Sequence, residues 1–206
     1  MSEAAERGRR PGRPRSTVAD ASIVRATLEL LLEDGYRALT MEQVRSRAGV
    51  GKATLYRRYG SKQELVTEAI RHLNQPLDRP DTGAVREDIL AVARSVLAGA
   101  ERVQFASFAP RLLAESAGDA EMHAIFYENL VAPRRAVMAD VLRHGVERGE
   151  LRADLDVELA VDILTGPWVY RLLISGPNPQ AVYRTDPVAL LDLILGGLAA
   201  RPSGDS

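Results

Sequence analysis

Apolar side chains recur every three or four positions along almost the whole chain, a spacing that places them on one face of an α-helix. Ala21, Val24, Leu28 and Leu31 are one such series. The alternating β-branched residues and Asn-Gly turns that mark strands and hairpins are absent from the sequence. The pattern therefore predicts an all-α protein, with helices over residues 18–34, 40–48, 52–59, 61–73, 84–99, 105–117, 120–148, 156–174 and 187–199.

Individual residues predict where these helices end or bend. Gly35 is placed to end the first helix in a left-handed conformation. Thr40 and Ser61 each have a Gln or Glu three residues later, which is the pattern of a capping box at a helix start. Pro133 and Pro167 each remove an amide within a long predicted helix, so we expect a kink at both positions.

Composition divides the 206 residues into four parts. Residues 1–16 are rich in Arg, Gly and Pro and have little to bury, which predicts a disordered basic arm. Residues 17–75 contain the short helices. Residues 76–83 form a linker rich in Pro, Asp and Gly. Residues 84–200 contain the longer amphipathic helices, and we expect them to form a second domain.

The charge of the chain is unevenly distributed. Its net charge is only −1, but residues 1–62 carry 13 Lys and Arg against 7 Asp and Glu, whereas the remainder carries 14 against 21. A basic N-terminal part on an acidic body indicates that this part meets a polyanion such as nucleic acid.

Several classes of protein are disfavoured. The apolar runs are shorter than the ~18 residues of a membrane span, and the polar N-terminus does not resemble a secretory signal. The sequence contains no cysteine, which fits a reducing cytoplasm. It also lacks a nucleophile turn, a phosphate-binding glycine loop and a cluster of metal ligands. We therefore predict no enzyme activity, no cofactor and no bound metal.

Residues 40–65 carry the functional signal. They read as two short helices joined by a tight glycine-containing turn, the helix-turn-helix motif whose second helix lies in a DNA major groove. Thr54 can contact a base edge, and Lys52 or Arg57 can pair with guanine or phosphate. Helix starts at Thr40 and Ser61 present amides to phosphates. The predicted DNA contacts, including two in the arm, are Arg13, Arg15, Thr40, Arg45, Gly51, Lys52, Ala53, Thr54, Tyr56, Arg57, Arg58 and Lys62.

Alternatives remain for several of these residues. Tyr56 and Tyr59 can be core residues, and Arg45 and Arg47 can lie on a solvated helix face. In the arm, Gly-Arg-Pro around Arg13 is typical of minor-groove binding to A·T tracts, but the same residues can add only salt-dependent affinity or serve as a solubilising tail.

The motif resembles the DNA-binding domain of the tetracycline-repressor (TetR) family over some 48 residues without a gap. The matching residues are Gly35, Tyr36, Thr40, Val44, Ala48, Gly49, Val50, Thr54, Leu55, Tyr56, Tyr59, Gly60, Ser61, Lys62 and Leu65. The resemblance implies that Thr40, Tyr56 and Lys62 hold phosphates. It also implies that bases face Lys52, Ala53, Thr54 and Arg57. This chain departs from the family pattern in having Gly51 instead of Ser and Arg58-Tyr59 instead of His-Phe.

The C-terminal part is similar, more weakly, to one class of TetR C-terminal domains. That similarity implies a dimer formed by the last two helices and a cavity for a small-molecule effector. Two helices carry more apolar surface than a terminal hairpin needs, which also favours a homodimer; the residues are Val161, Leu164, Val169, Leu172 and Leu173 on one and Val188, Leu191, Ile194, Leu195 and Leu198 on the next. The pocket candidates, any of which can equally be ordinary core, are Phe105, Phe108, Arg111, Leu112, Met122, Phe126, Trp168 and Tyr170, with Glu115, Met138 and Arg171 in addition.

The sequence thus predicts an all-α, dimeric transcriptional regulator with an N-terminal three-helix helix-turn-helix domain and a C-terminal helical domain for ligand binding and dimerisation. We expect a cytoplasmic repressor that binds a palindromic operator in double-stranded DNA and is released by a small molecule. The alternative is a ligand-independent activator or a DNA-architectural protein that uses the basic arm.

Overall fold

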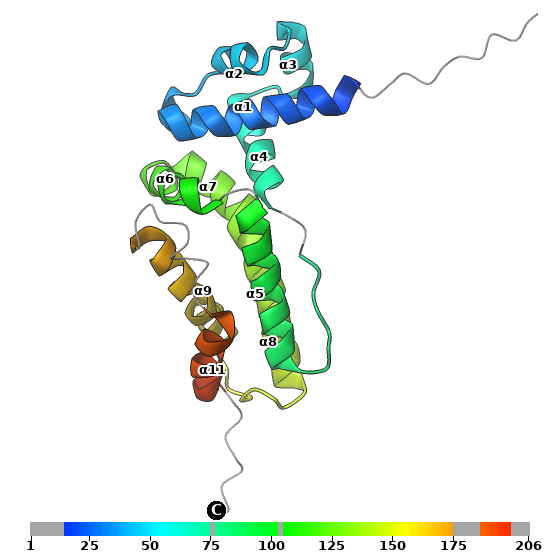
Figure 1. Cartoon of the computed structure of the whole chain (residues 1–206), viewed down its shortest axis with the longest axis vertical. Coiled ribbons are helices and arrows are strands. Elements are labelled where there is room, and N and C mark those ends of the chain that lie inside the picture. Colours follow the sequence, from blue (N-terminus) through cyan, green and yellow to red (C-terminus); the bar gives the residue numbers. More distant parts are fainter. Residues whose placement is uncertain (1–14, 75–76, 103–104, 175–185, 199–206) are drawn as a thin grey trace, which may run out of the picture.

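The computed structural model describes residues 15–74, 77–102, 105–174 and 186–198 (Figure 1). Within these ranges the chain is helical and contains no strand, so the all-α prediction is confirmed. The helices are α1 (Arg15–Ala38), α2 (Met41–Ala48), α3 (Lys52–Arg58), α4 (Lys62–Leu73), α5 (Val85–Arg102), α6 (Phe105–Gly118), α7 (Ala120–Phe126), η1 (Tyr127–Val131), α8 (Ala132–Glu147), α9 (Val157–Ile174) and α11 (Pro187–Leu198).

Helices α1 to α4 form an N-terminal head. Figure 1 shows α1 lying across the head, α2 and α3 on its outer side, and α4 descending towards the body. Helix α1 packs against α2 and α4. The fully or almost fully buried side chains of this head include Ile23, Leu30, Leu31, Val44, Leu55, Leu65 and Ile70. Apolar burial on one face of each short helix therefore holds the motif together.

The caps predicted at the start of two helices are present. The Thr40 hydroxyl accepts from the Gln43 amide, and the Gln43 side chain accepts from the Thr40 amide at 2.8 Å. At α4, the Ser61 hydroxyl accepts from the Glu64 amide at 3.1 Å. The Glu64 carboxylate accepts from the amide of Gly60, one residue before the cap, at 2.7 Å. Both helix starts are thus fixed by local sequence.

Helix α1 is broken at Gly35, where a helix end was predicted, and then continues for one turn to Ala38. Gly35 has φ +82° and ψ 169°, a conformation that a side chain disfavours. A Cβ at Gly35 would also lie only 2.5 Å from the Glu115 carboxylate oxygen Oε1. This carboxylate accepts from the amide of Tyr36 at 3.1 Å. The position therefore requires glycine both for its backbone and for the close approach of α6.

Further polar contacts join the end of α1 to α6 and α7. The Tyr36 hydroxyl donates to Glu121 at 2.6 Å, and burial, together with this bond, raises the pKa of Tyr36. Arg37 pairs with Asp119 at 3.1 Å. These contacts link residues about eighty positions apart in the sequence, so they fix the head on the body.

The hydrophobic core of the head continues beyond the predicted linker. Leu112, Met122, Ile125, Phe126 and Leu130, from α6, α7 and η1, belong to the same buried cluster as the head residues. Figure 1 shows α6 and α7 directly beneath α1. A second buried cluster joins α5, α8, α9 and α11. The first cluster therefore spans both predicted domains.

The predicted 120–148 helix is divided into α7, the π-helical turn η1 and α8. Pro133 lies in the first turn of α8, where its missing amide is tolerated. The preceding turn η1 is π-helical, so its backbone hydrogen bonds span five residues instead of four. This change lies where the missing Pro133 amide would have donated. Helix α9 continues through Pro167. None of the described helices is long and apolar enough to span a bilayer.

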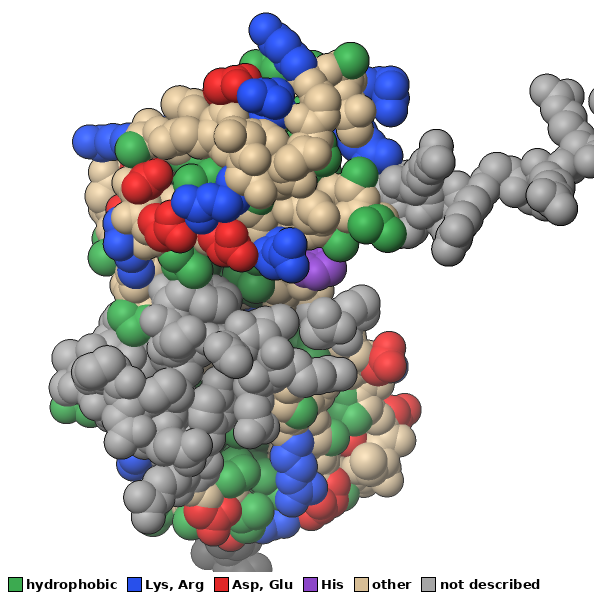
Figure 2. Space-filling view, turned by 45° about the horizontal axis from the view of Figure 1, so that its top comes forward, with side chains coloured by type: hydrophobic (Ala, Val, Ile, Leu, Met, Phe, Trp, Pro, Cys, Tyr) green, Lys and Arg blue, Asp and Glu red, His purple; other side chains and the backbone are tan. Residues whose placement is uncertain are grey.

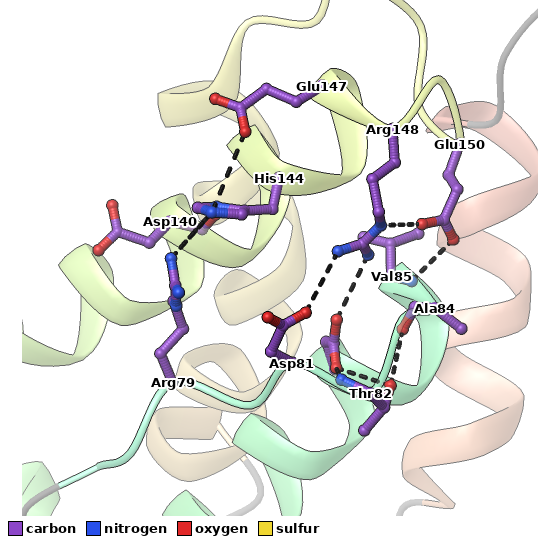
Figure 3. A network of polar contacts seen from close by, with 11 residues as sticks. Arg79, Asp81, Thr82, Ala84, Val85, Asp140, His144, Glu147, Arg148 and Glu150 are labelled. Carbon is purple, nitrogen blue, oxygen red and sulfur yellow. Dashed lines mark hydrogen bonds and ion pairs between the residues drawn. The ribbon is translucent and has the colours of Figure 1, made fainter.

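A polar network attaches the linker to the end of the body (Figure 3). The Asp88 carboxylate, only 2% exposed, accepts from the Thr82 amide and hydroxyl, each at 2.7 Å. Arg148 lies 3.4 Å from Asp88 and 2.5 Å from Glu150, whose carboxylate accepts from the Val85 amide at 2.8 Å. The segment before α5 is therefore held in place although it has no regular structure.

Candidate nucleic-acid interface and ligand cavity

A tight turn between α2 and α3 sets the orientation of α3. Gly49 adopts the left-handed conformation, with φ 66° and ψ 29°. The Val50 amide donates to the Arg45 carbonyl at 3.2 Å. Leu55 is fully buried against the head core, so the opposite face of α3 points outward. This arrangement is the helix-turn-helix that the sequence predicts.

The outward face of α3 carries cations without acidic partners. Lys52, Ala53, Tyr56 and Arg57 are exposed, and Thr54 is half-buried. The Lys52 ammonium lies 5.8 Å from the centre of the Tyr56 ring. Neither Lys52 nor Arg57 forms an ion pair with any residue of the described ranges. Figure 2 shows Lys and Arg side chains projecting from the outer end of the head. Both cations can therefore meet phosphate or guanine without first breaking an ion pair.

Arg45 and Arg58 are held by carboxylates of the head. Arg58 pairs with Asp20 of α1. Arg45 pairs with Glu42 at 2.5 Å, and this hydrogen bond lowers the pKa of the Glu42 carboxyl. A phosphate would have to compete with these carboxylates for either guanidinium. Their predicted DNA contacts stay predictions, as do those of the other residues of the interface.

Lys62 and Thr40 also have partners within the head. The Lys62 ammonium donates to the Tyr36 carbonyl at 3.0 Å and lies 4.3 Å from the centre of the Tyr36 ring. The Thr40 side chain takes part in the capping box. Gly51 begins α3 without a side-chain cap, which leaves the first amides of the helix available to an anion. Arg13 and the side chain of Arg15 lie outside the described residues.

The body contains a cavity of about 270 Å³, near the lower end of the range of small-molecule sites. Its walls come from α5, η1, α8, α9 and α11, with Leu113 and Phe126 at the end nearest the head. The lining residues are Ile89, Leu90, Val92, Ala93, Val96, Leu97, Leu113, Phe126, Leu130, Val131, Arg134, Arg135, Met138, Leu164, Thr165, Trp168, Val169, Pro187, Leu190, Leu191 and Ile194.

The structure brings only some of the predicted pocket residues together. Phe126, Met138 and Trp168 line the cavity. The other pocket candidates lie elsewhere. Leu112 and Met122 are buried in the core shared with the head, Arg111 donates to the Glu33 carbonyl at 2.8 Å, Glu115 contacts Tyr36, and Tyr170 and Arg171 are exposed on α9. The side chains of Phe105 and Phe108 lie outside the described residues.

The sequence reasoning missed the α5 wall of the cavity and the two arginines that follow Pro133. Apolar periodicity shows that α5 has a buried face, but it does not show which helix that face meets. The signal for the arginines was a pair of cations on a helix whose other side is apolar. The described residues hold no group of three or more metal-ligating side chains.

Large apolar side chains are exposed on α9 and α11. Leu193 of α11 is 81% exposed, Leu159 of α9 is 55% exposed, and Ile163, Val169 and Tyr170 of α9 are exposed as well. These exposed apolar side chains make α9 and α11 candidates for an interaction surface.

Comparison with known proteins identifies the family. Residues 23–69 match the family model described as bacterial regulatory proteins, tetR family, and residues 79–192 match the tetracyclin repressor-like C-terminal domain. The uncharacterized HTH-type transcriptional regulator YdeS of Bacillus subtilis is 33% identical over 178 residues, 85% of this chain and 88% of that protein. The DNA-binding transcriptional repressor TetR of Mycobacteroides abscessus is 27% identical, over 81% of this chain and 88% of its own.

A solved structure agrees with this assignment. The TetR family transcription regulator SCO0332 is 33% identical, with a TM-score of 0.57 over 88% of this chain and 98% of that chain. The exposed, cation-bearing α3 and the two matching domain models lead to the same result: this chain belongs to the TetR family of transcriptional regulators, which are DNA-binding proteins and not enzymes.

Proposed function

We propose that this protein is a dimeric cytoplasmic repressor that binds a palindromic operator through α3 and leaves it when a small molecule enters the body. The observation that carries the proposal is the outer face of α3, where Lys52 and Arg57 form no ion pair with a described residue while Leu55 is buried in the core of the head. One such helix reads only a few base pairs. Two helices related by a twofold axis read a palindrome with higher specificity.

The exposed apolar surface of α9 and α11 supports dimerisation. Pairing the two copies of this surface removes Leu159, Ile163 and Leu193 from water, at about 25 cal/mol for each Å² buried. A palindrome requires that this pairing leave both α3 helices on the same side of the dimer.

The position of the cavity supports control by a ligand. Phe126 and Leu130 line the cavity and also belong to the core that continues under α4. A ligand that displaces these side chains therefore acts on the packing of the head itself. A difference of about 1–3 kcal/mol between the bound and free arrangements changes operator affinity by about 5–150-fold.

Selection of bound DNA from a random pool, using the full chain, tests this function. We expect a palindromic consensus, and loss of its binding in Arg57→Ala. Arg94→Ala, which removes an exposed cation from α5 of the body, is the matched control and should bind normally. Selected DNA without twofold symmetry, or equal loss in both variants, would refute the proposal.

Deletion of residues 1–14 tests the alternative of an architectural protein that depends on its basic arm. The deletion leaves α1 whole. A modest loss of affinity with an unchanged consensus supports the operator-binding repressor. Loss of nearly all binding would favour the arm.

A further inference from the structure

The charges among the described lining residues of the cavity are all positive. Arg134 and Arg135 are the ionisable side chains of this lining, which contains no Asp or Glu from the described ranges. The remaining lining is apolar apart from Thr165 and the indole of Trp168. The Thr165 hydroxyl already donates to the Val161 carbonyl at 2.8 Å. Within the described lining, the groups that can bind a charged part of a ligand are thus the two arginines.

Arg135 is neutralised by the protein. Its guanidinium pairs with Asp162 and, at 3.0 Å, with Glu158, both on α9. These hydrogen bonds raise the pKa of Arg135. Arg135 therefore needs no negative charge from a ligand.

Arg134 has no acidic partner within the described residues. Its Nε donates to the Asn74 side chain at 3.2 Å, and its Nη2 lies 3.4 Å from the Leu73 carbonyl, both at the end of α4. No described acceptor is bonded to Nη1. Burial lowers the pKa of Arg134, because nothing nearby offsets the cost of desolvating its charge. Arg134 is half-buried, and a partly desolvated cation without a counterion is unfavourable, so the site has room for one negative charge.

We propose that the cavity binds an amphipathic carboxylate, with an apolar chain or ring system against α5, α9 and α11 and its single negative charge on Arg134. A carboxylate matches a guanidinium with two parallel hydrogen bonds. A neutral molecule would leave the half-buried charge of Arg134 without a counterion, and an amine would be repelled. A phosphate would carry a second charge for which the described lining offers no second free cation.

This ligand class rests on the proposed function, because it makes the same cavity the effector site. It also gives the ligand a direct effect on the head. A carboxylate that occupies the Arg134 donors competes with the Leu73 carbonyl and Asn74 at the end of α4. The apolar part meanwhile presses on Phe126 and Leu130.

Trp168 provides the assay, since it lines the cavity and is the single tryptophan of the sequence. Decanoate, decanol and decylamine share one apolar chain and differ in charge. Titrated below their micelle points into the full-length protein, decanoate should change the Trp168 emission with an affinity at least about tenfold higher than that of decanol, and decylamine should bind most weakly. Equal affinities for acid and alcohol, or no response to decanoate, would overturn the proposal.

Two substitutions locate the charge preference. Arg134→Gln should bring the affinity ratio of decanoate to decanol close to one, whereas Arg143→Gln, on the exposed part of the same helix, should leave it unchanged. Circular dichroism confirms that each variant is folded. Arg134→Lys, which keeps the charge but not the paired donors, should retain part of the preference. A preference for decanoate that survives in folded Arg134→Gln would contradict the proposal. The comparison of the three ligands on the wild-type protein tests the proposal even if a variant does not fold.

Operator release separates this inference from the proposed function. If decanoate binds in an Arg134-dependent manner but does not release the selected DNA, the ligand class holds and the proposed control of DNA binding fails. If a neutral or cationic compound releases DNA and binds equally well to Arg134→Gln, the control holds and the ligand class fails.

Discussion

Replacing Asp88 by asparagine tests whether a buried carboxylate holds the linker on the body. Oδ1 of Asp88 accepts from the Thr82 amide and hydroxyl, and Oδ2 accepts from Arg148. Asparagine keeps one acceptor for Thr82 but loses the charge, which weakens those two bonds by about 0.5–1 kcal/mol each. It also turns an amide NH₂ group towards Arg148, which removes about 1 kcal/mol more. We therefore expect the free energy of unfolding to fall by about 2–3 kcal/mol.

The same carboxylate makes the effect depend on pH. Burial alone would raise the pKa of Asp88, but hydrogen bonds from Thr82 and Arg148 outweigh it and lower that pKa below its usual value. Above the unfolded-state pKa of about 3.9 its stabilisation is fully present, and it is lost as the pH falls through the lower folded-state pKa. The difference between wild type and Asp88→Asn should thus be constant from about pH 5 to 8 and shrink below about pH 4.

Urea unfolding followed by circular dichroism measures this difference, at one protein concentration because dimerisation affects apparent stability. Asp81→Asn is the matched control. Asp81 is 66% exposed and 3.8 Å from Arg148, so its loss should cost less than about 0.5 kcal/mol. If both variants lost the same stability, or if the Asp88→Asn difference were as large at pH 3 as at pH 7, the buried carboxylate would not be what holds the linker.

Three further substitutions test the head and the body. Lys62→Ala should weaken DNA binding evenly across sequences and reduce the slope of log affinity against log salt by about one unit. Gln63→Ala, on the same turn, should change neither. An unchanged slope in Lys62→Ala would exclude a phosphate contact. Thr54→Ala should change the selected consensus at one or two positions, by about 1–3 kcal/mol for a good base contact, and an identical consensus argues against that contact. Gly145→Ala would place a Cβ 2.5 Å from Val85. Although alanine favours a helix, we expect a net loss of about 1–3 kcal/mol in thermal unfolding, and an unchanged melting temperature would show that α5 and α8 can separate at no cost.

The helices and their caps were predictable because their causes are local. The Thr40 hydroxyl and the Gln43 side chain are three residues apart, and the break at Gly35 depends on the backbone of one residue. The subdivision of the 120–148 helix into α7, η1 and α8 went beyond the prediction of a kink at Pro133. Here the chain adjusts its hydrogen bonds over the preceding turn, a choice that periodicity does not reveal.

The side chains of the site were less predictable, because their partners are distant in the sequence. The sequence shows two adjacent arginines after Pro133. It does not show that Asp162 of α9 neutralises Arg135, whereas Arg134 contacts Asn74 at the end of α4. In the same way, the residues next to Lys62 in the sequence do not indicate that its ammonium donates to the carbonyl of Tyr36. Pairing of charges is decided by packing, and packing follows from contacts between elements that the sequence separates.

The shared core changes how far a signal has to travel from the cavity to the DNA-binding head. If the two predicted domains had separate cores, coupling would depend on the linker and on the few polar contacts around Tyr36. Instead, Phe126 and Leu130 line the cavity and also belong to the core under α4, so the proposed ligand would meet side chains that pack against the head. Close-packed side chains change in discrete steps, because neighbours cannot overlap or leave voids without cost. The coupling of about 1–3 kcal/mol that a regulator needs is therefore within reach of a rearrangement at this wall alone.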